Sequence, residues 1–205
     1  MTAMILSTLV EPLIPLWLKI AYSVYVAVTL PIYYKKYGPA NFLWFSDIAL
    51  VATVAALWLE SPILASMMAI AILIPELIWN IGFFSGLVTG KPALGLANYM
   101  FDEEKPLYLR ALSLFHIFLP PLLLWLIYRL GYDEGALLAQ SVVALVVLPV
   151  CYCFTNRNDN INWVFGTGAI AQQKIPPMLH LLLMMIAFPL LIYLPTHLFL
   201  LILFS

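Results

Sequence analysis

Charged residues are scarce in this sequence. Asp, Glu, Lys and Arg make up 9% of the 205 residues, whereas 64% are hydrophobic and the mean hydropathy is +1.02. A water-soluble domain carries about 25% charged residues, so this composition excludes a soluble globular protein and predicts a surface that faces lipid. The net charge of −1 offers no attraction to a polyanion, and no nucleic-acid partner is expected.

Several sequence motifs are also missing. There is no Gly-x4-Gly-Lys-Ser/Thr, Gly-x-Gly-x2-Gly or Gly-x-Ser-x-Gly, which excludes the common nucleotide-binding and hydrolase signatures. No basic segment precedes the first apolar run, so no removable signal peptide is expected. The two cysteines, Cys151 and Cys153, are spaced to point apart on a helix, and no disulfide between them is predicted.

Long apolar runs are what the sequence has in abundance. About 20 apolar residues suffice for a helix to cross the hydrocarbon core of a bilayer, and continuous apolarity favours helices over an alternating membrane barrel. We therefore predict an all-α fold, a single transmembrane domain over residues 1–205 that forms a polytopic bundle of six spanning helices. The predicted helices cover residues 13–34, 42–59, 63–87, 107–130, 135–154 and 176–204. Prolines within the runs predict kinks, at positions 31, 75, 120, 121, 149, 189 and 195.

The distribution of Lys and Arg predicts the orientation in the cell membrane. The connections after the first, third and fifth predicted helices, with their flanks, hold seven of the nine cations: Lys35, Lys36, Lys91, Lys105, Arg110, Arg157 and Lys174. The opposite side holds Lys19 and Arg129. Because positive residues favour the cytoplasmic side, the long loops 91–106 and 155–175 are predicted to be cytoplasmic and both termini to lie outside.

One acidic residue lies in the middle of an apolar run. Glu76 occurs in LIPELIWN, residues 73–80, and Asn80 shares its helix face at i+4. His116 lies at a comparable depth in the next predicted helix. Because ionisable groups inside a membrane are costly, they are functional candidates, and we predict Glu76 and His116 as proton-handling catalytic residues and Asn80 as a ligand contact. The alternative is that Glu76 is protonated or hydrogen-bonded and only ties helices together.

Two more polar residues extend this cluster. Asp47 is near the start of the second predicted helix and His180 is near the start of the sixth, on the same predicted side. Together with Glu76, Asn80 and His116 they predict a polar pocket in the cytoplasmic half, where Asp47 and His180 bind a ligand. For Asp47 the alternative is a solvated or helix-capping group.

The three histidines do not have the spacing of a metal site. Positions 116, 180 and 197 contain no His-x3-His or His-Glu-x2-His pair, which would place two ligands on one helix face. No metal site is predicted, and the sequence indicates no cofactor.

The stretch NRNDNINWVFG, residues 156–166, is the most distinctive polar segment. Asn and Asp favour turns, and Trp suits the membrane interface. One interpretation is a lid in which Asn162 and Trp163 contact a ligand, and the other is an ordered interfacial turn.

Three segments carry a resemblance to known proteins. GPANFLWFSDIAL, YMFDEEKPLYLRALSLFH and DNINWVFG resemble a family of bacterial multi-pass membrane proteins with no assigned reaction or ligand. The resemblance covers most of the chain and implies a membrane protein without adding a functional residue. In size and helix number alone, the chain is also similar to the substrate-binding subunits of energy-coupling-factor vitamin transporters.

Three classes of function fit these observations. The first is binding or modification of a hydrophobic small molecule or lipid, with membrane lipids as the expected partners. The second is a transporter subunit that captures a small solute. The third is a non-catalytic scaffold or accessory subunit, as a homo-oligomer or within a larger membrane complex. Whether the protein is an enzyme stays open between these classes.

Overall fold

Helices make up all the regular structure in the computed structural model, which describes residues 13–168 and 171–204. The α-helices are α1 (Leu16–Tyr37), α2 (Phe45–Leu59), α3 (Pro62–Thr89), α4 (Leu107–Leu112), α5 (Phe115–Leu130), α6 (Ala136–Phe154), α7 (Pro177–Ala187) and α8 (Leu194–Phe204). Three short 3₁₀ helices lie in the connections, η1 (Pro39–Leu43), η2 (Asn98–Phe101) and η3 (Ile161–Trp163). A π-helical turn, η4 (Phe188–Tyr193), joins α7 to α8.

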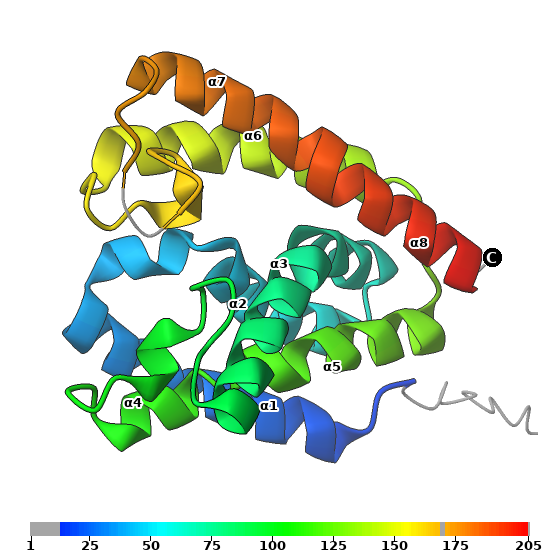
Figure 1. The fold of residues 1–205 in the computed structure, drawn as a ribbon. Coiled ribbons are helices and arrows are strands. Elements are labelled where there is room, and N and C mark those ends of the chain that lie inside the picture. The colour runs from blue at the N-terminus through cyan, green and yellow to red at the C-terminus, as the bar shows by residue number, and fades with distance from the viewer. Residues whose placement is uncertain (1–12, 169–170, 205) are drawn as a thin grey trace, which may run out of the picture.

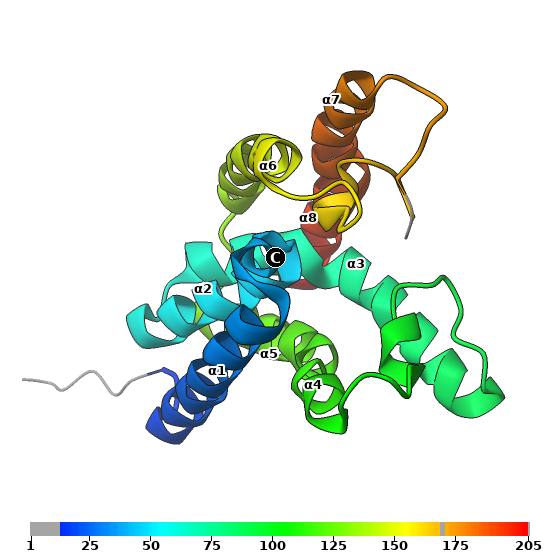
Figure 2. The same cartoon turned by 90° about the vertical axis from the view of Figure 1, so that its left-hand side faces the viewer.

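Helix α3 occupies the centre of the bundle. It contacts α2 and α5 on one side and α6, η4 and α8 on the other. Figures 1 and 2 show the same division, with α1, α2 and α5 on one side of α3 and with α6, α7 and α8 on the other. Small buried residues of α3, such as Ala65, Ala69 and Ala71, allow these close approaches. The position of α3 therefore decides which side chains meet inside the bundle.

Five helical stretches of the described residues are long and apolar enough to cross a membrane. They are Leu16–Tyr37, Pro62–Thr89, Leu107–Leu130, Ala136–Phe154 and Pro177–Phe204. These stretches support a membrane-embedded, all-α protein. The predicted orientation stays a prediction, and residues 1–12 and 205, at the two termini, lie outside the described residues.

The prediction of six spanning helices is one more than the structure shows. The predicted helix 42–59 corresponds to α2, which has 15 residues. Its expected first turn is lost because η1 ends at Leu43 and Trp44 then has an extended backbone, with ψ of 135°. At 1.5 Å per residue, α2 spans roughly 22 Å, short of the ~30 Å of a hydrocarbon core.

Two of the predicted helices are interrupted by local bonding. The stretch 107–130 divides into α4 and α5 at Ser113, whose hydroxyl donates to the Leu109 carbonyl at 3.2 Å, a bond that bends helices. The last stretch contains η4 because Pro189 has no N–H for the preceding turn. The N–H of Leu194 then reaches back to the carbonyl of Pro189, five residues away.

The loop between α3 and α4 packs on one glycine-bearing face of α3. A Cβ on Gly82 would lie 2.6 Å from the backbone oxygen of Ala93, and a Cβ on Gly86 would overlap the ring of Phe101. Trp79 of α3 joins Ala97 and Met100 of the loop in a second apolar cluster, separate from the main core. The loop 91–106 is therefore a packed part of the fold.

At the opposite end of the bundle, Glu60 ties the start of α1 to the turn between α2 and α3. Its carboxylate accepts hydrogen bonds from the backbone N–H groups of Leu13 and Ile14, both at 3.1 Å, and from Lys19 Nζ at 2.8 Å. The hydrogen bond from Lys19 lowers the pKa of Glu60 below its ordinary value of 4.5. Burial acts in the opposite direction, but the backbone N–H groups of Ile14 and Leu13 lower the pKa further.

This lowered pKa predicts how stability changes in acid. A depressed carboxylate pKa stabilises the fold above the unfolded value, near pH 4.5, and this contribution is lost as the pH falls through the folded pKa. We expect Glu60→Gln to cost about 1 kcal/mol at neutral pH, and the cost to shrink towards zero in acid. Thermal unfolding of both proteins in detergent between neutral and acid pH measures it. Glu104→Gln, at an exposed loop carboxylate, is the control, and a cost of Glu60→Gln that does not change with pH contradicts the prediction.

Candidate functional site

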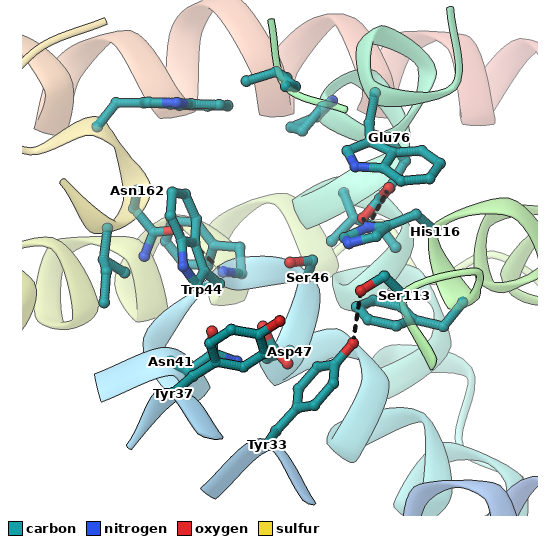
Figure 3. A pocket seen from close by; sticks show the side chains of 18 of the residues that line it. Tyr33, Tyr37, Asn41, Trp44, Ser46, Asp47, Glu76, Ser113, His116 and Asn162 are labelled. Carbon is teal, nitrogen blue, oxygen red and sulfur yellow. Dashed lines mark hydrogen bonds and ion pairs between the residues drawn. The ribbon is translucent and has the colours of Figure 1, made fainter. Parts of the chain in front are cut away.

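A cavity of about 480 Å³ lies in the half of the bundle that contains the C-terminal end of α1 and the N-terminal end of α2. Figure 3 shows Ser46 near its middle, with Asp47 and Tyr37 on one side and Glu76 and His116 on the other. Aromatic side chains make up much of its wall. They are Tyr33, Tyr37, Trp44, Phe45, Trp79, Tyr99, Phe115, Trp163 and Phe188. This composition is typical of a pocket for a small organic ligand, mostly apolar with a few polar groups.

Glu76 and His116 form a hydrogen-bonded pair across α3 and α5, which is an ion pair when the imidazole is protonated. His116 Nδ1 lies 2.8 Å from each carboxylate oxygen of Glu76. A carboxylate only accepts, so the imidazole Nδ1–H donates. The ring is held between Trp79, with centroids 4.6 Å apart, and Phe115, with centroids 4.1 Å apart. The pair is therefore rigid, and both of its members line the cavity.

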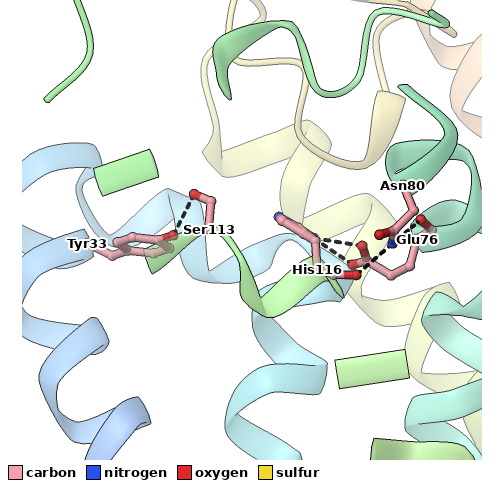
Figure 4. A network of polar contacts seen from close by, with 5 residues as sticks. All are labelled: Tyr33, Glu76, Asn80, Ser113 and His116. Carbon is pink, nitrogen blue, oxygen red and sulfur yellow. Dashed lines mark hydrogen bonds and ion pairs between the residues drawn. The ribbon is translucent and has the colours of Figure 1, made fainter. Parts of the chain in front are cut away.

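The second nitrogen of His116 is available for chemistry. Figure 4 shows it on the ring edge opposite Glu76, on the side of Ser113 and Tyr33. No described residue makes a hydrogen bond to Nε2. When a carboxylate holds Nδ1–H, a neutral imidazole presents a proton acceptor at Nε2, and the charged form presents a donor. This arrangement can accept or deliver a proton at a group bound beside it.

Asn80 lies behind the cavity wall and was predicted to contact a ligand. Its side-chain Nδ2 donates to two backbone carbonyls, those of Glu76 and His116, each at 2.8 Å. The His116 carbonyl is free to accept because Pro120, four residues later, has no N–H to return to it. Asn80 is therefore a positioning residue, since it holds the backbone of both members of the ion pair.

Two buried polar atoms on the wall have no hydrogen-bond partner among the described residues. They are Oδ1 of Asp47 and Nε1 of Trp79, and each of these residues is 5% exposed. Asp47 is thus not the solvated group of the alternative interpretation. Buried polar groups in folded proteins are almost always hydrogen-bonded, so these two atoms are candidates for contact with a ligand group in the cavity that their residues line.

Other polar residues of the wall were not singled out in the sequence. Tyr33 and Ser113 share a hydrogen bond of 2.9 Å between their hydroxyls. The Lys105 ammonium lies over the ring of Tyr37, at 5.8 Å, and over that of Tyr99, at 5.0 Å. Trp79 could have been found, since it lies at i+3 from Glu76 on one helix face. The rest come from loops and helix ends whose positions only the folded chain defines.

Asn162 lines the cavity, but its side-chain atoms are already bonded within the protein. Its Oδ1 accepts from the N–H of Phe45 at 3.1 Å, and its Nδ2 donates to the carbonyl of Leu43 at 2.7 Å and to Cys151 Sγ at 3.4 Å. Asn162 has a left-handed backbone, with φ of 51°. It ties the 155–175 connection to the start of α2, as the ordered-turn interpretation expects.

His180 and Trp163 act together on the far wall. Trp163 lines the cavity, stacks on Phe188 with centroids 6.1 Å apart and meets Trp44 edge to face. His180 is buried outside the lining, and its Nε2–H donates to the Trp163 carbonyl at 3.0 Å. Of the seven residues predicted from the sequence, five line the cavity, and Asn80 and His180 support it from behind. Within residues 13–168 and 171–204, no three His, Cys, Asp or Glu side chains are grouped to hold a metal ion.

The ion pair predicts a measurable coupling between α3 and α5. Interhelical hydrogen bonds in membrane proteins contribute about 1 kcal/mol, and charge-assisted bonds are about twice as strong. We therefore expect Glu76→Ala and His116→Ala to be non-additive, with a coupling free energy of about 2 kcal/mol. Reversible unfolding in mixed micelles of the wild type, both single variants and the double variant measures it. Glu76→Ala combined with Tyr132→Ala, a residue near the opposite end of the bundle, is the additive control, and additivity in the first cycle contradicts the prediction.

The bonds of Asn162 predict protection of the neighbouring loop. Asn162→Ala removes three hydrogen bonds of about 1 kcal/mol each, so the loop should unfold locally more often and let trypsin bind the backbone around Arg157, whose side chain is already exposed. We expect faster cleavage at Arg157, followed by mass spectrometry of the fragments. Asn158→Ala, at an exposed site in the same loop, should leave the rate unchanged, and equal rates in both variants would show that Asn162 does not hold the loop.

Comparisons of the chain with protein-family models, with curated proteins and with solved structures found no match. The resemblance to a family of bacterial multi-pass membrane proteins stays a prediction. What the site can do therefore follows from its own geometry.

Proposed function

We propose that this membrane protein binds, or chemically modifies, a hydrophobic small molecule or lipid in the cavity beside Glu76 and His116. The observation that carries the proposal is the coincidence of three features in one place. A largely aromatic cavity, a rigid carboxylate–imidazole pair and two unpartnered buried polar atoms lie together. It is the coincidence that supports a ligand site, because buried atoms without a partner also occur away from the cavity, at Arg110 Nε and Gln140 Oε1.

The size and lining of the cavity support a ligand of this class. A volume of about 480 Å³ lies within the range of small-molecule pockets, roughly 300–1,000 Å³. The aromatic wall would contact the apolar part of the ligand, and Asp47, Trp79 and His116 would orient its polar part. Proton handling would fall to His116, with Glu76 holding the tautomer and orientation of the ring.

The position of the cavity suggests the route of entry. It lies at the end of the bundle where α1 ends and α2 begins, beside the loops 91–106 and 155–175. The distribution of positive charges predicts that these loops are cytoplasmic. A lipid of the cytoplasmic leaflet, or a molecule dissolved in that leaflet, would reach the cavity without crossing the bilayer.

Native mass spectrometry of gently extracted protein tests the proposal. We expect the wild type to retain a bound hydrophobic molecule. Ser46→Leu places a bulky apolar side chain near the middle of the cavity and leaves the polar residues in place, so it should abolish most of that binding. Ser141→Leu is the matched control because the Ser141 hydroxyl in α6 bonds only within its own helix, to the Leu137 carbonyl. A wild type without a bound molecule, or a Ser46→Leu variant that retains as much, would refute the proposal.

A further inference from the structure

On one side of the cavity a buried acceptor atom has no hydrogen-bond donor, and on the other side a buried donor has no acceptor. On the α2 side, the Asp47 carboxylate needs a donor, because its Oδ1 is buried without one. On the α3 side, the indole N–H of Trp79 has no acceptor in hydrogen-bonding geometry, and the Tyr99 side chain is its nearby polar neighbour. A carboxylate only accepts and an indole N–H only donates. A molecule that satisfies both therefore carries a donor group and a separate acceptor oxygen.

The charge of Asp47 indicates what kind of ligand group would donate a hydrogen bond to it. The ion pairs of the described residues are Lys19 with Glu60 and His116 with Glu76, so Asp47 has no cationic partner among them. Lys105 also lines the cavity, but its ammonium lies over the rings of Tyr37 and Tyr99. A carboxylate withdrawn from water is stabilised most by an opposite charge close to it. The group that best fits Asp47 is therefore cationic.

The side chains around Asp47 favour the same kind of group. Figure 3 shows Asp47 on the same side of the cavity as Tyr33 and Tyr37, whose rings meet edge to face with centroids 5.4 Å apart. The negative faces of aromatic rings attract ammonium groups, and Lys105 already presents one to this wall. A carboxylate beside aromatic rings is a chemical match for a ligand ammonium group.

We propose that the Asp47 side of the cavity binds the ammonium group of a lipophilic amine, while Trp79 Nε1 donates to an acceptor oxygen of the same molecule. The apolar body of the ligand then lies against Ile72, Phe115 and Phe188. This inference rests on the proposed function and names the ligand class for that cavity. Two sources supply this chemistry, the headgroup of an aminophospholipid and a small lipophilic amine.

Binding measurements with matched probes test the ammonium group and separate the two sources. Delipidated protein is titrated with phosphatidylethanolamine and phosphatidylglycerol of identical chains, and with dodecylamine and dodecanol, by native mass spectrometry. We expect each amine to bind about tenfold more tightly than its partner without nitrogen, the value of one charge-assisted hydrogen bond. Binding of both amines, or of phosphatidylethanolamine alone, indicates a lipid headgroup, and binding of dodecylamine alone indicates a small amine.

Substitutions at Asp47 test the residue directly. Asp47→Asn keeps the shape and removes the charge, so it should weaken amine binding about tenfold and leave dodecanol binding unchanged. Asp47→Glu should retain the preference for amines. Asp102→Asn, at an exposed carboxylate of the loop 91–106, is the matched control and should have no effect.

Three results would overturn the inference. Equal binding of amines and their nitrogen-free partners by the wild type refutes it without any variant, as does an Asp47→Asn protein that keeps the preference. In both cases a ligand that Ser46→Leu displaces would leave the proposed function standing. Absence of any bound hydrophobic molecule from the wild type overturns both proposals together.

Discussion

Helix α3 crosses the middle of the bundle with a carboxylate, Glu76, that neither lipid nor apolar side chains can solvate. The structure meets this constraint with His116 of α5, 2.8 Å away, because an uncompensated buried charge would cost several kcal/mol. The same contact is reinforced by Asn80, which donates to a His116 carbonyl that Pro120 has left free. A proline, an amide and an ion pair thus define how α3 and α5 meet.

The rest of the site depends on how α3 and α5 pack against each other. With α3 and α5 in place, Trp79 stacks on His116 and faces the cavity together with Glu76. The start of α2 then brings Asp47 to the other side of the same space. The loop after α6 completes the wall, because Asn162 bonds to Leu43 and Phe45 and His180 holds the carbonyl of Trp163. These walls are therefore held by polar bonds that are buried or partly buried.

The two interpretations of Glu76, a tie between helices and a functional group, describe the same contact. The bond to His116 Nδ1 joins α3 to α5, and it also orients the imidazole so that Nε2 is available. What separates this cluster from an ordinary interhelical network is the cavity beside it, with unpartnered atoms in residues of its wall. Asp47 Oδ1 and Trp79 Nε1 are buried without partners in residues that line the cavity, whereas Nδ2 of Asn80 and both side-chain polar atoms of Asn162 are bonded within the protein.

The sequence by itself determined the class of the protein. Scarce charge and long apolar runs require a lipid-facing helical structure. The depth of a residue along a helix follows from residue counting, so Glu76 and His116 could be predicted as a pair of functional candidates at similar depth. The π-helical turn at Pro189 lies at one of the prolines predicted to kink a helix. The shortness of α2 and the break at Ser113 were missed, because they depend on single backbone and side-chain bonds. Only the tertiary structure decided that Asn80 and His180 stand behind the wall while Tyr33, Tyr37 and Lys105 stand on it. Helix periodicity gives the face on which a residue lies, but the packing of neighbouring helices and the folding of two loops onto them decide what that face meets.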